Sequence, residues 1–264
     1  MAIVNDVINA FSDLAPATDM EPGGYDNVGL LVGEREASVT RVLCCLDATV
    51  AVIDEAIAIG AQMIVAHHPM IFSPVKTVTT DTVIGKKTIK AIENGVAIYA
   101  AHTNLDFTPD GINDYAAELL GLKAVAVTTP FGQPGAGMGR VGSLEKTMTA
   151  DELRKRCAEV FRDDFVRIIG SKTATVRKVA VINGAGGGDT EYIDAAIAAG
   201  ADCLVTADVK HHVAVHAVDR GFTLIEPQHY TMEHVYIEKL AAKLREKLAG
   251  VEVFVSEKDV IPRV

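Results

Sequence analysis

The residues of this chain that could do chemistry are histidines placed next to one another or close to acids. Imidazole and carboxylate groups together bind divalent ions such as zinc, iron(II) or manganese, and a carboxylate can bridge two ions. Two ions about 3.5–4 Å apart can hold a water molecule between them and lower its pKa. We therefore predict a two-metal site built from His67, His68, Asp106, His229 and Glu233.

These residues lie where apolar segments end. The segment 63–66 runs directly into His67-His68, and the segments 95–102 and 221–229 each end in a histidine that is followed four residues later by an acid. In open α/β sheets, ligands bind outside the carboxyl ends of the strands. A lone histidine on an apolar strand is usually a core residue. His216 and His234 lie in or beside predicted helices, and we interpret them as ordinary structural residues. Two adjacent histidines and two equivalent His-x-x-x-acid pairs favour a metal site instead.

An internal repeat accounts for the equivalence of these positions. Residues 53–65 (IDEAIAIGAQMIV) and 193–205 (IDAAIAAGADCLV) share eight of thirteen residues at a constant offset of 140. Each copy predicts the end of a helix, a glycine that stops it, and a buried strand. Apolar strands are expected on both sides of each copy, at 41–47 and 95–102 in the first and at 178–184 and 221–229 in the second.

This alternation predicts an α/β protein of two related lobes with parallel or mixed sheets covered by helices. The Gly- and Pro-rich stretch 130–139 is the predicted linker, between a first lobe at 1–129 and a second at 140–264, with the metal site between them. Thr149 and Glu152 form a predicted capping box that opens a helix over 150–161.

Composition limits the other classes of function. The chain has a net charge of −10 and no Lys/Arg cluster, so a surface for duplex nucleic acid is not expected. The four cysteines show no Cys-x-x-Cys spacing and suit a reducing compartment. Residues 1–11 predict an amphipathic helix, not a signal peptide, and no apolar run is long enough for a membrane span. We expect a cytoplasmic protein.

The glycines of 184–188 follow a predicted strand and resemble part of a dinucleotide-binding fingerprint. The full G-x-G-x-x-G pattern needs another glycine where the chain has Asp189. A nicotinamide cofactor is therefore not expected. A phosphate lying against the backbone amides is kept as an alternative to a simple turn.

Several motifs occur in an order that identifies a resemblance. They are YDNVGLLVG (25–33), AHHPMIF (66–72), AHTNLD (101–106), GRVGSL (139–144), ADVKHH (207–212) and HYTME (229–233). Together they resemble the Nif-three-like family, the GTP cyclohydrolase 1 type 2 homologues, over nearly the whole chain. Two departures from the family pattern are Tyr25, where tryptophan is usual, and Gln228, which follows Pro227 where small residues are usual.

The resemblance implies a toroidal homohexamer, a trimer of dimers, with two divalent metal ions (zinc, iron, manganese or similar) in each chain. It implies the same ligands that the spacing predicts: His67, His68, Asp106, His229 and Glu233, with Glu233 bridging the ions. It also implies hydrolysis of a nucleotide of the GTP cyclohydrolase type.

Three functions remain open from the sequence. The first is a metal-dependent hydrolase in which His102 is a general acid/base or a substrate contact. Asp208, Lys210 and His212 would then bind a substrate phosphate or orient the ligand histidines, or they would be purely structural. The second is a metal-binding ring that acts as an interaction scaffold without catalysis. The third is a metal-dependent phosphoesterase that uses the same ligands.

Overall fold

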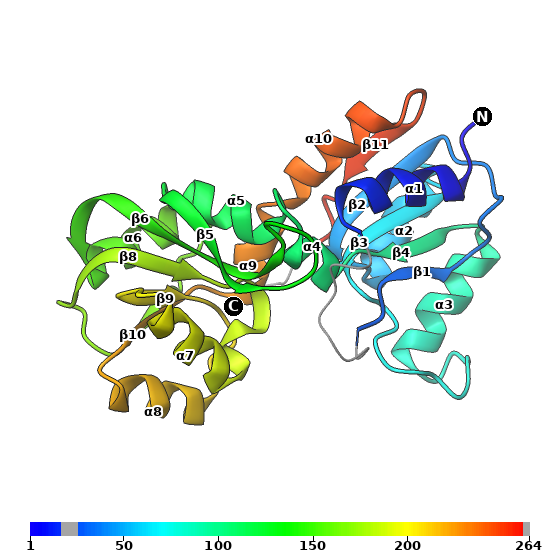
Figure 1. The fold of residues 1–264 in the computed structure, drawn as a ribbon. Coiled ribbons are helices and arrows are strands. Elements are labelled where there is room, and N and C mark those ends of the chain that lie inside the picture. Colours follow the sequence, from blue (N-terminus) through cyan, green and yellow to red (C-terminus); the bar gives the residue numbers. More distant parts are fainter. Residues whose placement is uncertain (17–25, 261–264) are drawn as a thin grey trace. The chain divides into compact units, whose positions relative to one another are not determined.

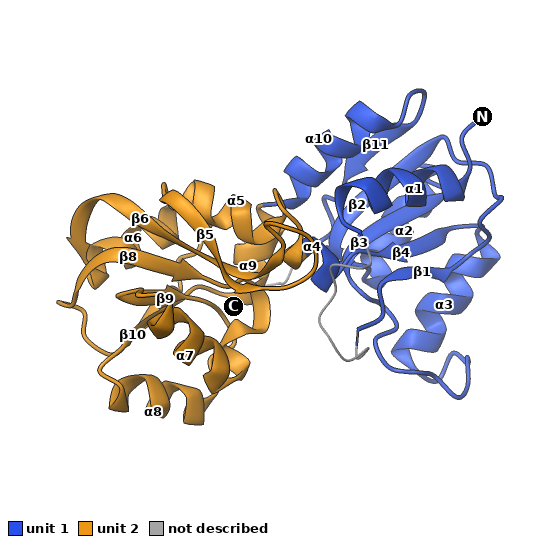
Figure 2. Ribbon diagram, viewed as in Figure 1, with its two compact units in different colours: residues 1–105, 236–264 blue, residues 106–235 orange. Residues whose placement is uncertain are grey.

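The structure is a computed structural model that describes residues 1–16 and 26–260. It is a mixed α/β protein with two sheets (Figure 1). The chain divides into two compact units, Met1–Leu105 with Tyr236–Val264 and Asp106–Val235 (Figure 2). None of the described helices has both the length and the apolar character that a membrane span requires. Tyr25 lies outside the described residues.

The first unit is built on one five-stranded sheet. Its strands are β1 (Gly29–Val32), β2 (Arg41–Asp47), β3 (Met63–His68), β4 (Ala97–Ala100) and β11 (Glu252–Val255). They lie in the order β1-β4-β3-β2-β11, and all are parallel except β1, which pairs antiparallel with β4. Its helices are α1 (Val4–Leu14), α2 (Val50–Ala58), α3 (Val83–Glu93), α4 (Thr103–Phe107), which runs into the second unit, and α10 (Ile237–Lys247).

Helices cover both faces of this sheet. Successive side chains of a strand point to opposite faces, so β2 sends Leu43 and Cys45 to one face and Cys44 to the other. Leu43 and Cys45 pack in a core cluster with apolar residues of α2 and α3. On the other face α10 contacts β2, and the ring of Phe11 in α1 lies 5.3 Å from that of Tyr99 in β4. Strands buried on both faces explain why their sequences are continuously apolar.

The second unit is built on one six-stranded sheet. Its strands are β5 (Lys123–Pro130), β6 (Gly137–Thr149), β7 (Arg167–Ile169), β8 (Thr175–Val181), β9 (Cys203–Val205) and β10 (Thr223–Glu226). The order is β5-β6-β8-β9-β10-β7, with β8, β9 and β10 parallel and the other pairs antiparallel. Its helices are α5 (Ile112–Leu119), α6 (Ala150–Val160), α7 (Thr190–Ala198), α8 (His211–Asp219), α9 (His229–His234) and the 3₁₀ turn η2 (Gly184–Gly188).

The topology confirms the predicted duplication. The first unit runs β2-α2-β3-α3-β4, and the second runs β8-α7-β9-α8-β10, each as a parallel sheet. Each unit adds one antiparallel strand beside the last parallel strand, β1 beside β4 and β7 beside β10. The glycines that end α2 and α7, Gly60 and Gly200, both have positive φ (66° and 77°), which glycine adopts without a steric cost.

The predicted capping box is also present. The Thr149 hydroxyl accepts a hydrogen bond from the backbone N–H of Glu152, and the Glu152 carboxylate accepts one from the backbone N–H of Thr149. Two N–H groups that the helix itself cannot satisfy are thus bonded at the start of α6, within one residue of the predicted helix.

The two compact units differ from the predicted division at 130–139. That stretch forms the turn of the antiparallel hairpin of β5 and β6, so its glycine and proline residues serve a turn and not a linker. The chain passes between units at Leu105/Asp106 and at Val235/Tyr236. The C-terminal segment belongs to the first unit because β11 pairs with β2, with Glu252 opposite Arg41. Nothing in the sequence 250–255 indicates that this segment pairs with β2.

Candidate metal centre

Three histidines gather at the carboxyl edge of the first sheet. His67 and His68 are the last residues of β3, and His102 follows the neighbouring parallel strand β4. The three residues each offer a ring nitrogen, and these nitrogens all lie within 4.8 Å of one another. Ring centroids are 5.0 Å apart for His67 and His68 and 5.3 Å for His67 and His102. The first unit therefore brings together three imidazoles that could ligate an ion.

Each of these rings is held at Nδ1 by an oxygen atom. His67 Nδ1 lies 2.8 Å from the carbonyl oxygen of Ala101, which can only accept, so Nδ1 carries the proton and Nε2 the lone pair. His68 Nδ1 lies 3.0 Å from Asp47 Oδ1, and His102 Nδ1 lies 2.7 Å from Asp26 Oδ1. Ligand histidines are commonly oriented in this way, with Nε2 directed to the metal.

Asp26 anchors more than the ring of His102. Its Oδ2 accepts hydrogen bonds from the backbone N–H of Thr103 (3.1 Å) and from the Thr103 hydroxyl (2.6 Å). Burial disfavours the charged form of Asp26, but the bonds from His102 and Thr103 outweigh it and hold the pKa of that carboxyl well below its usual range. Asp26 is therefore ionised at neutral pH and holds both the ring of His102 and Thr103, the two residues with which the chain leaves β4 and enters α4.

Two of these anchoring acids were not predicted. Asp47 could have been found, because it ends the strand beside β3 and pairs in register with His68. Asp26 lies in a loop 76 residues before His102, and no periodicity in the sequence connects the two residues. The predicted ligands follow from strand ends, whereas their anchors depend on tertiary contacts.

The second unit carries two of the predicted ligands on α9. His229 and Glu233 are four residues apart and so share one face of this helix, and His229 Nε2 lies 2.9 Å from Glu233 Oε2. His229 Nδ1 lies 2.7 Å from Asp208 Oδ2. Asp208 has a positive φ of 52°, which is uncommon for a residue other than glycine. Its contact with His229 matches the predicted alternative in which Asp208 orients a ligand histidine.

Asp106 also belongs to the second unit and is buried, with 8 % of its surface exposed. Its carbonyl oxygen accepts a hydrogen bond from Asn113 Nδ2 (3.0 Å), and Asn113 Oδ1 in turn accepts one from the backbone N–H of Asn183 (2.9 Å). This chain of bonds ties the backbone at Asp106 to the end of β8. The rigid sheet of the second unit thus positions the backbone of this predicted ligand.

The Gly-rich turn η2 lies directly against the α9 group. Gly184 has a φ of +60°, and a Cβ atom there would lie 2.4 Å from Glu233 Oε1 and 3.2 Å from His229 Nε2. A Cβ on Gly187 would lie 2.4 Å from the carbonyl oxygen of Ala207. The glycines therefore allow close packing, which favours the simple turn among the alternatives drawn from the sequence.

The remaining predicted residues lie near the start of α8 or have ordinary contacts. Lys210 is the N-cap residue of α8, and His212 lies in its first turn. His216 bonds to Asp194 (3.0 Å), and His234 stacks on Tyr230 with ring centroids 4.7 Å apart. The last two match their expected role as ordinary structural residues. The roles of Lys210 and His212 stay predictions.

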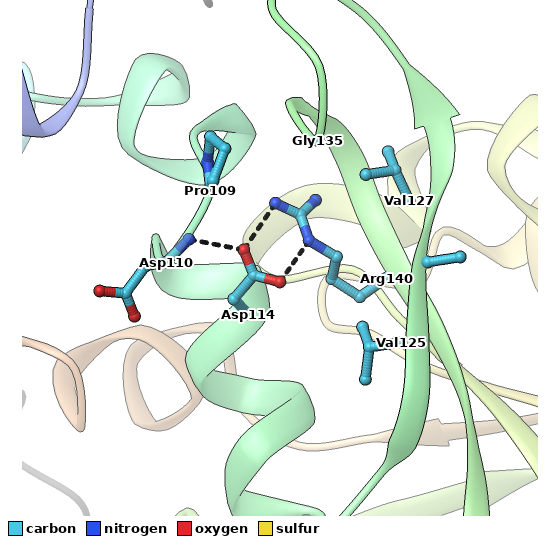
Figure 3. A pocket seen from close by; sticks show the side chains of 8 residues that line it. Pro109, Asp110, Asp114, Val125, Val127, Gly135 and Arg140 are labelled. Atoms are coloured by element: carbon cyan, nitrogen blue, oxygen red, sulfur yellow. Dashed lines mark hydrogen bonds and ion pairs between the residues drawn. The ribbon is translucent and has the colours of Figure 1, made fainter.

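A cavity of about 490 Å³ in the second unit lies away from these groups, because its lining includes none of the predicted ligands. Figure 3 shows Arg140 and Asp114 meeting beside it, with Arg140 Nε 2.6 Å from Asp114 Oδ1 and Nη2 2.9 Å from Oδ2. Arg140 is 1 % exposed and also donates to the carbonyl oxygens of Gly137 and Gly139. The guanidinium of Arg140 therefore links the β5–β6 hairpin to α5.

We expect Arg140→Met to lower the free energy of unfolding by about 3 kcal/mol, because it removes the guanidinium that pairs with Asp114 and donates to several backbone carbonyl groups. Denaturant unfolding measures this change. Arg154→Met is the control, since Arg154 pairs with Asp151 on the surface of α6 and such pairs contribute at most about 1 kcal/mol. Equal losses in the two variants would contradict a structural role for Arg140.

Comparison with known proteins relates the whole chain to one family. The family model described as Duf34/NIF3 (NGG1p interacting factor 3) matches residues 2–262. A Clostridium acetobutylicum protein named GTP cyclohydrolase 1 type 2 homolog is 37% identical over 265 residues, which cover 98% of this chain and 97% of the relative. The fold matches that of a Bacillus cereus protein related to NIF3, with a TM-score of 0.89, 26% identity and 97% of each chain covered. A Staphylococcus aureus protein gives a TM-score of 0.89 at 27% identity, over 99% of this chain and 98% of the other. The chain belongs to the Duf34/NIF3 family.

Proposed function

We propose that this chain binds two divalent metal ions and is a metal-dependent hydrolase that acts on a nucleotide. The observation that carries the proposal is the common orientation of four histidines, His67, His68, His102 and His229. In each of them an oxygen atom lies within hydrogen-bond distance of Nδ1. Nε2 is then the nitrogen that a metal would bind, and in His229 it lies 2.9 Å from Oε2 of Glu233, another of the proposed ligands.

The donor atoms fit ions of this kind. Imidazole nitrogens and carboxylate oxygens suit zinc, iron(II) and manganese. The cysteines, by contrast, are all buried free thiols, and burial raises the pKa of Cys44 to about 12. We propose that His67, His68, Asp106, His229 and Glu233 would hold the two ions.

The bound ions would stabilise developing negative charge and acidify water, which is the chemistry that hydrolysis requires. His102 would act as the general acid/base, because Asp26 holds its Nδ1 and leaves Nε2 to take up or release a proton. Its place in the cluster with His67 and His68 also makes it a candidate ligand. Asp208 would keep the ring of His229 oriented during turnover.

The substrate class rests on the relatives, which are named GTP cyclohydrolase 1 type 2 homologs. For GTP, addition of one water at C8 would open the imidazole ring of the base to a formamide, and hydrolysis of that formamide by a second water would release formate. A toroidal homohexamer is part of the same proposal. Light scattering measures the assembly directly, and a monomer would count against it.

Metal analysis tests the centre itself. We expect two ions per chain after loading with Zn²⁺, and a loss of at least one ion in His67→Ala and in Glu233→Gln, because each removes a ligand. Mass spectrometry of the desalted protein gives the stoichiometry. Fewer than one ion in the wild-type chain under all loading conditions would refute the proposal.

An activity assay tests the reaction. Metal-loaded wild-type protein should release formate from GTP, and His102→Gln should lower kcat by about 100-fold or more while two ions stay bound. Background release in the wild type and in Glu233→Gln alike would contradict the cyclohydrolase activity. Cleavage of simple phosphate esters with GTP left intact would support a phosphoesterase, and stoichiometric metal without turnover would support a scaffold.

A matched pair of glycine substitutions tests the packing of η2 on α9. Gly184→Ala should weaken Zn²⁺ binding by 10-fold or more, because the added methyl group would meet Glu233 and His229 in a strained conformation. Gly188→Ala is the control, since its Cβ would meet only the flexible end of Lys210, at 3.8 Å and beyond. Competition with a chromophoric chelator measures both affinities, and equal values would contradict this arrangement.

A further inference from the structure

We propose that Asp163 is a positioning residue of the metal centre, which sets the orientation of α9 and thereby of His229 and Glu233. This inference rests on the proposed function, because it concerns the same ligands. Asp163 lies on the connection between α6 and β7 and is fully buried, with 0 % of its surface exposed.

The carboxylate of Asp163 accepts hydrogen bonds from four donor groups of the described residues, and three of these groups lie at the start of α9. The backbone N–H of Gln228 donates to Oδ2 (2.6 Å), the Gln228 side-chain amide to Oδ1 (2.8 Å), and the Thr231 hydroxyl to Oδ2 (2.8 Å). The fourth donor is the backbone N–H of Phe165 (2.9 Å). Asp163 therefore binds both the residue before α9 and a residue inside its first turn.

These bonds hold the start of a helix that has no side-chain cap of its own. Gln228 is the N-cap residue, and its side chain forms no capping bond with the helix. The Asp163 carboxylate instead accepts the backbone N–H of Gln228, and the Thr231 hydroxyl is bonded both to this carboxylate and to the Gln228 carbonyl oxygen. A carboxylate from residue 163 thus fixes the start of a helix 65 residues later in the chain.

The short length of α9 makes this anchor important for the ligands. The helix has six residues, too few to be stable without tertiary contacts. It carries His229 at its first position and Glu233 at its fifth. A rotation of this one turn would move both donor groups together. An outer partner that orients metal ligands typically changes metal affinity by 10- to 100-fold when it is lost.

The charge of Asp163 strengthens the anchor. Burial disfavours ionisation, but the bonds from Gln228, Phe165 and Thr231 outweigh it and lower the pKa of the carboxyl below its usual value. All four donors then face an ionised acceptor, and such bonds are stronger than those between neutral groups. Asparagine has the same shape but lacks the charge and turns an N–H₂ group toward these donors.

The test compares Asp163→Asn with Asp202→Asn. Asp202 lies in the same unit and its carboxylate also accepts two backbone N–H groups, from Arg177 (2.9 Å) and Lys178 (2.8 Å), but at the amino end of β8. Zn²⁺ affinity is measured by competition with a chromophoric chelator, and the ligand field by the visible absorption of the Co²⁺ form. Thermal unfolding of the metal-free proteins reports stability separately.

We expect Asp163→Asn to weaken Zn²⁺ binding by 10-fold or more and to shift the Co²⁺ spectrum, while Asp202→Asn keeps wild-type values for both. Thr231→Val removes one of the donors with little change in shape and should weaken Zn²⁺ binding about 3-fold. If Asp163→Asn does not fold, Thr231→Val decides the question.

Two results would overturn the inference in distinguishable ways. Wild-type Zn²⁺ affinity and an unchanged Co²⁺ spectrum in Asp163→Asn, or in Thr231→Val where that variant decides, would show that Asp163 does not position the ligands. A wild-type chain that binds no Zn²⁺ would instead overturn the proposed function, and the positioning role with it.

Discussion

The parallel pairing of β3 with β2 and β4 is the constraint on which the chemistry of the first unit depends. Parallel strands end at the same edge, so residues that are 21 positions apart (β2 and β3) or 34 positions apart (β3 and β4) in the chain lie side by side there. Asp47, His67, His68 and His102 all come from that edge. The parallel strands β8, β9 and β10 repeat the arrangement, and Asp208 and His229 follow two of them.

The second constraint is the oxygen atom that faces each histidine at Nδ1. A strand end brings an imidazole to the right region but leaves its rotation about χ2 free. Ala101, Asp47, Asp26 and Asp208 remove that freedom with a carbonyl or carboxylate oxygen at 2.7 to 3.0 Å. In each of the four contacts an oxygen atom faces Nδ1, although the oxygen atoms belong to different parts of the fold. This shared form is a stronger argument for metal chemistry than the nearness of the rings alone.

Local sequence patterns predicted the parts of the structure that depend on neighbouring residues. The repeat at 53–65 and 193–205, the capping box at Thr149 and the strand at 41–47 can all be recognised from the types of neighbouring residues, and the structure confirms them. The predicted division at 130–139 differs from the two compact units, because their make-up depends on the pairing of β11 with β2, about 210 residues apart. Asp26 and Asp163 were missed for the same reason, since each acts on a segment 65 or more residues away.

The return of the C-terminal segment to the first sheet has a consequence for synthesis of the chain. The second unit, Asp106–Val235, is complete in the emerging polypeptide before α10 and β11 have been made. The edge of β2 has no partner strand until Glu252–Val255 leaves the ribosome. The second unit can therefore fold while the sheet of the first still has an open edge at β2, and unpaired strand edges favour aggregation. Residues 252–255 thus close the edge of a sheet whose other strands were made before them.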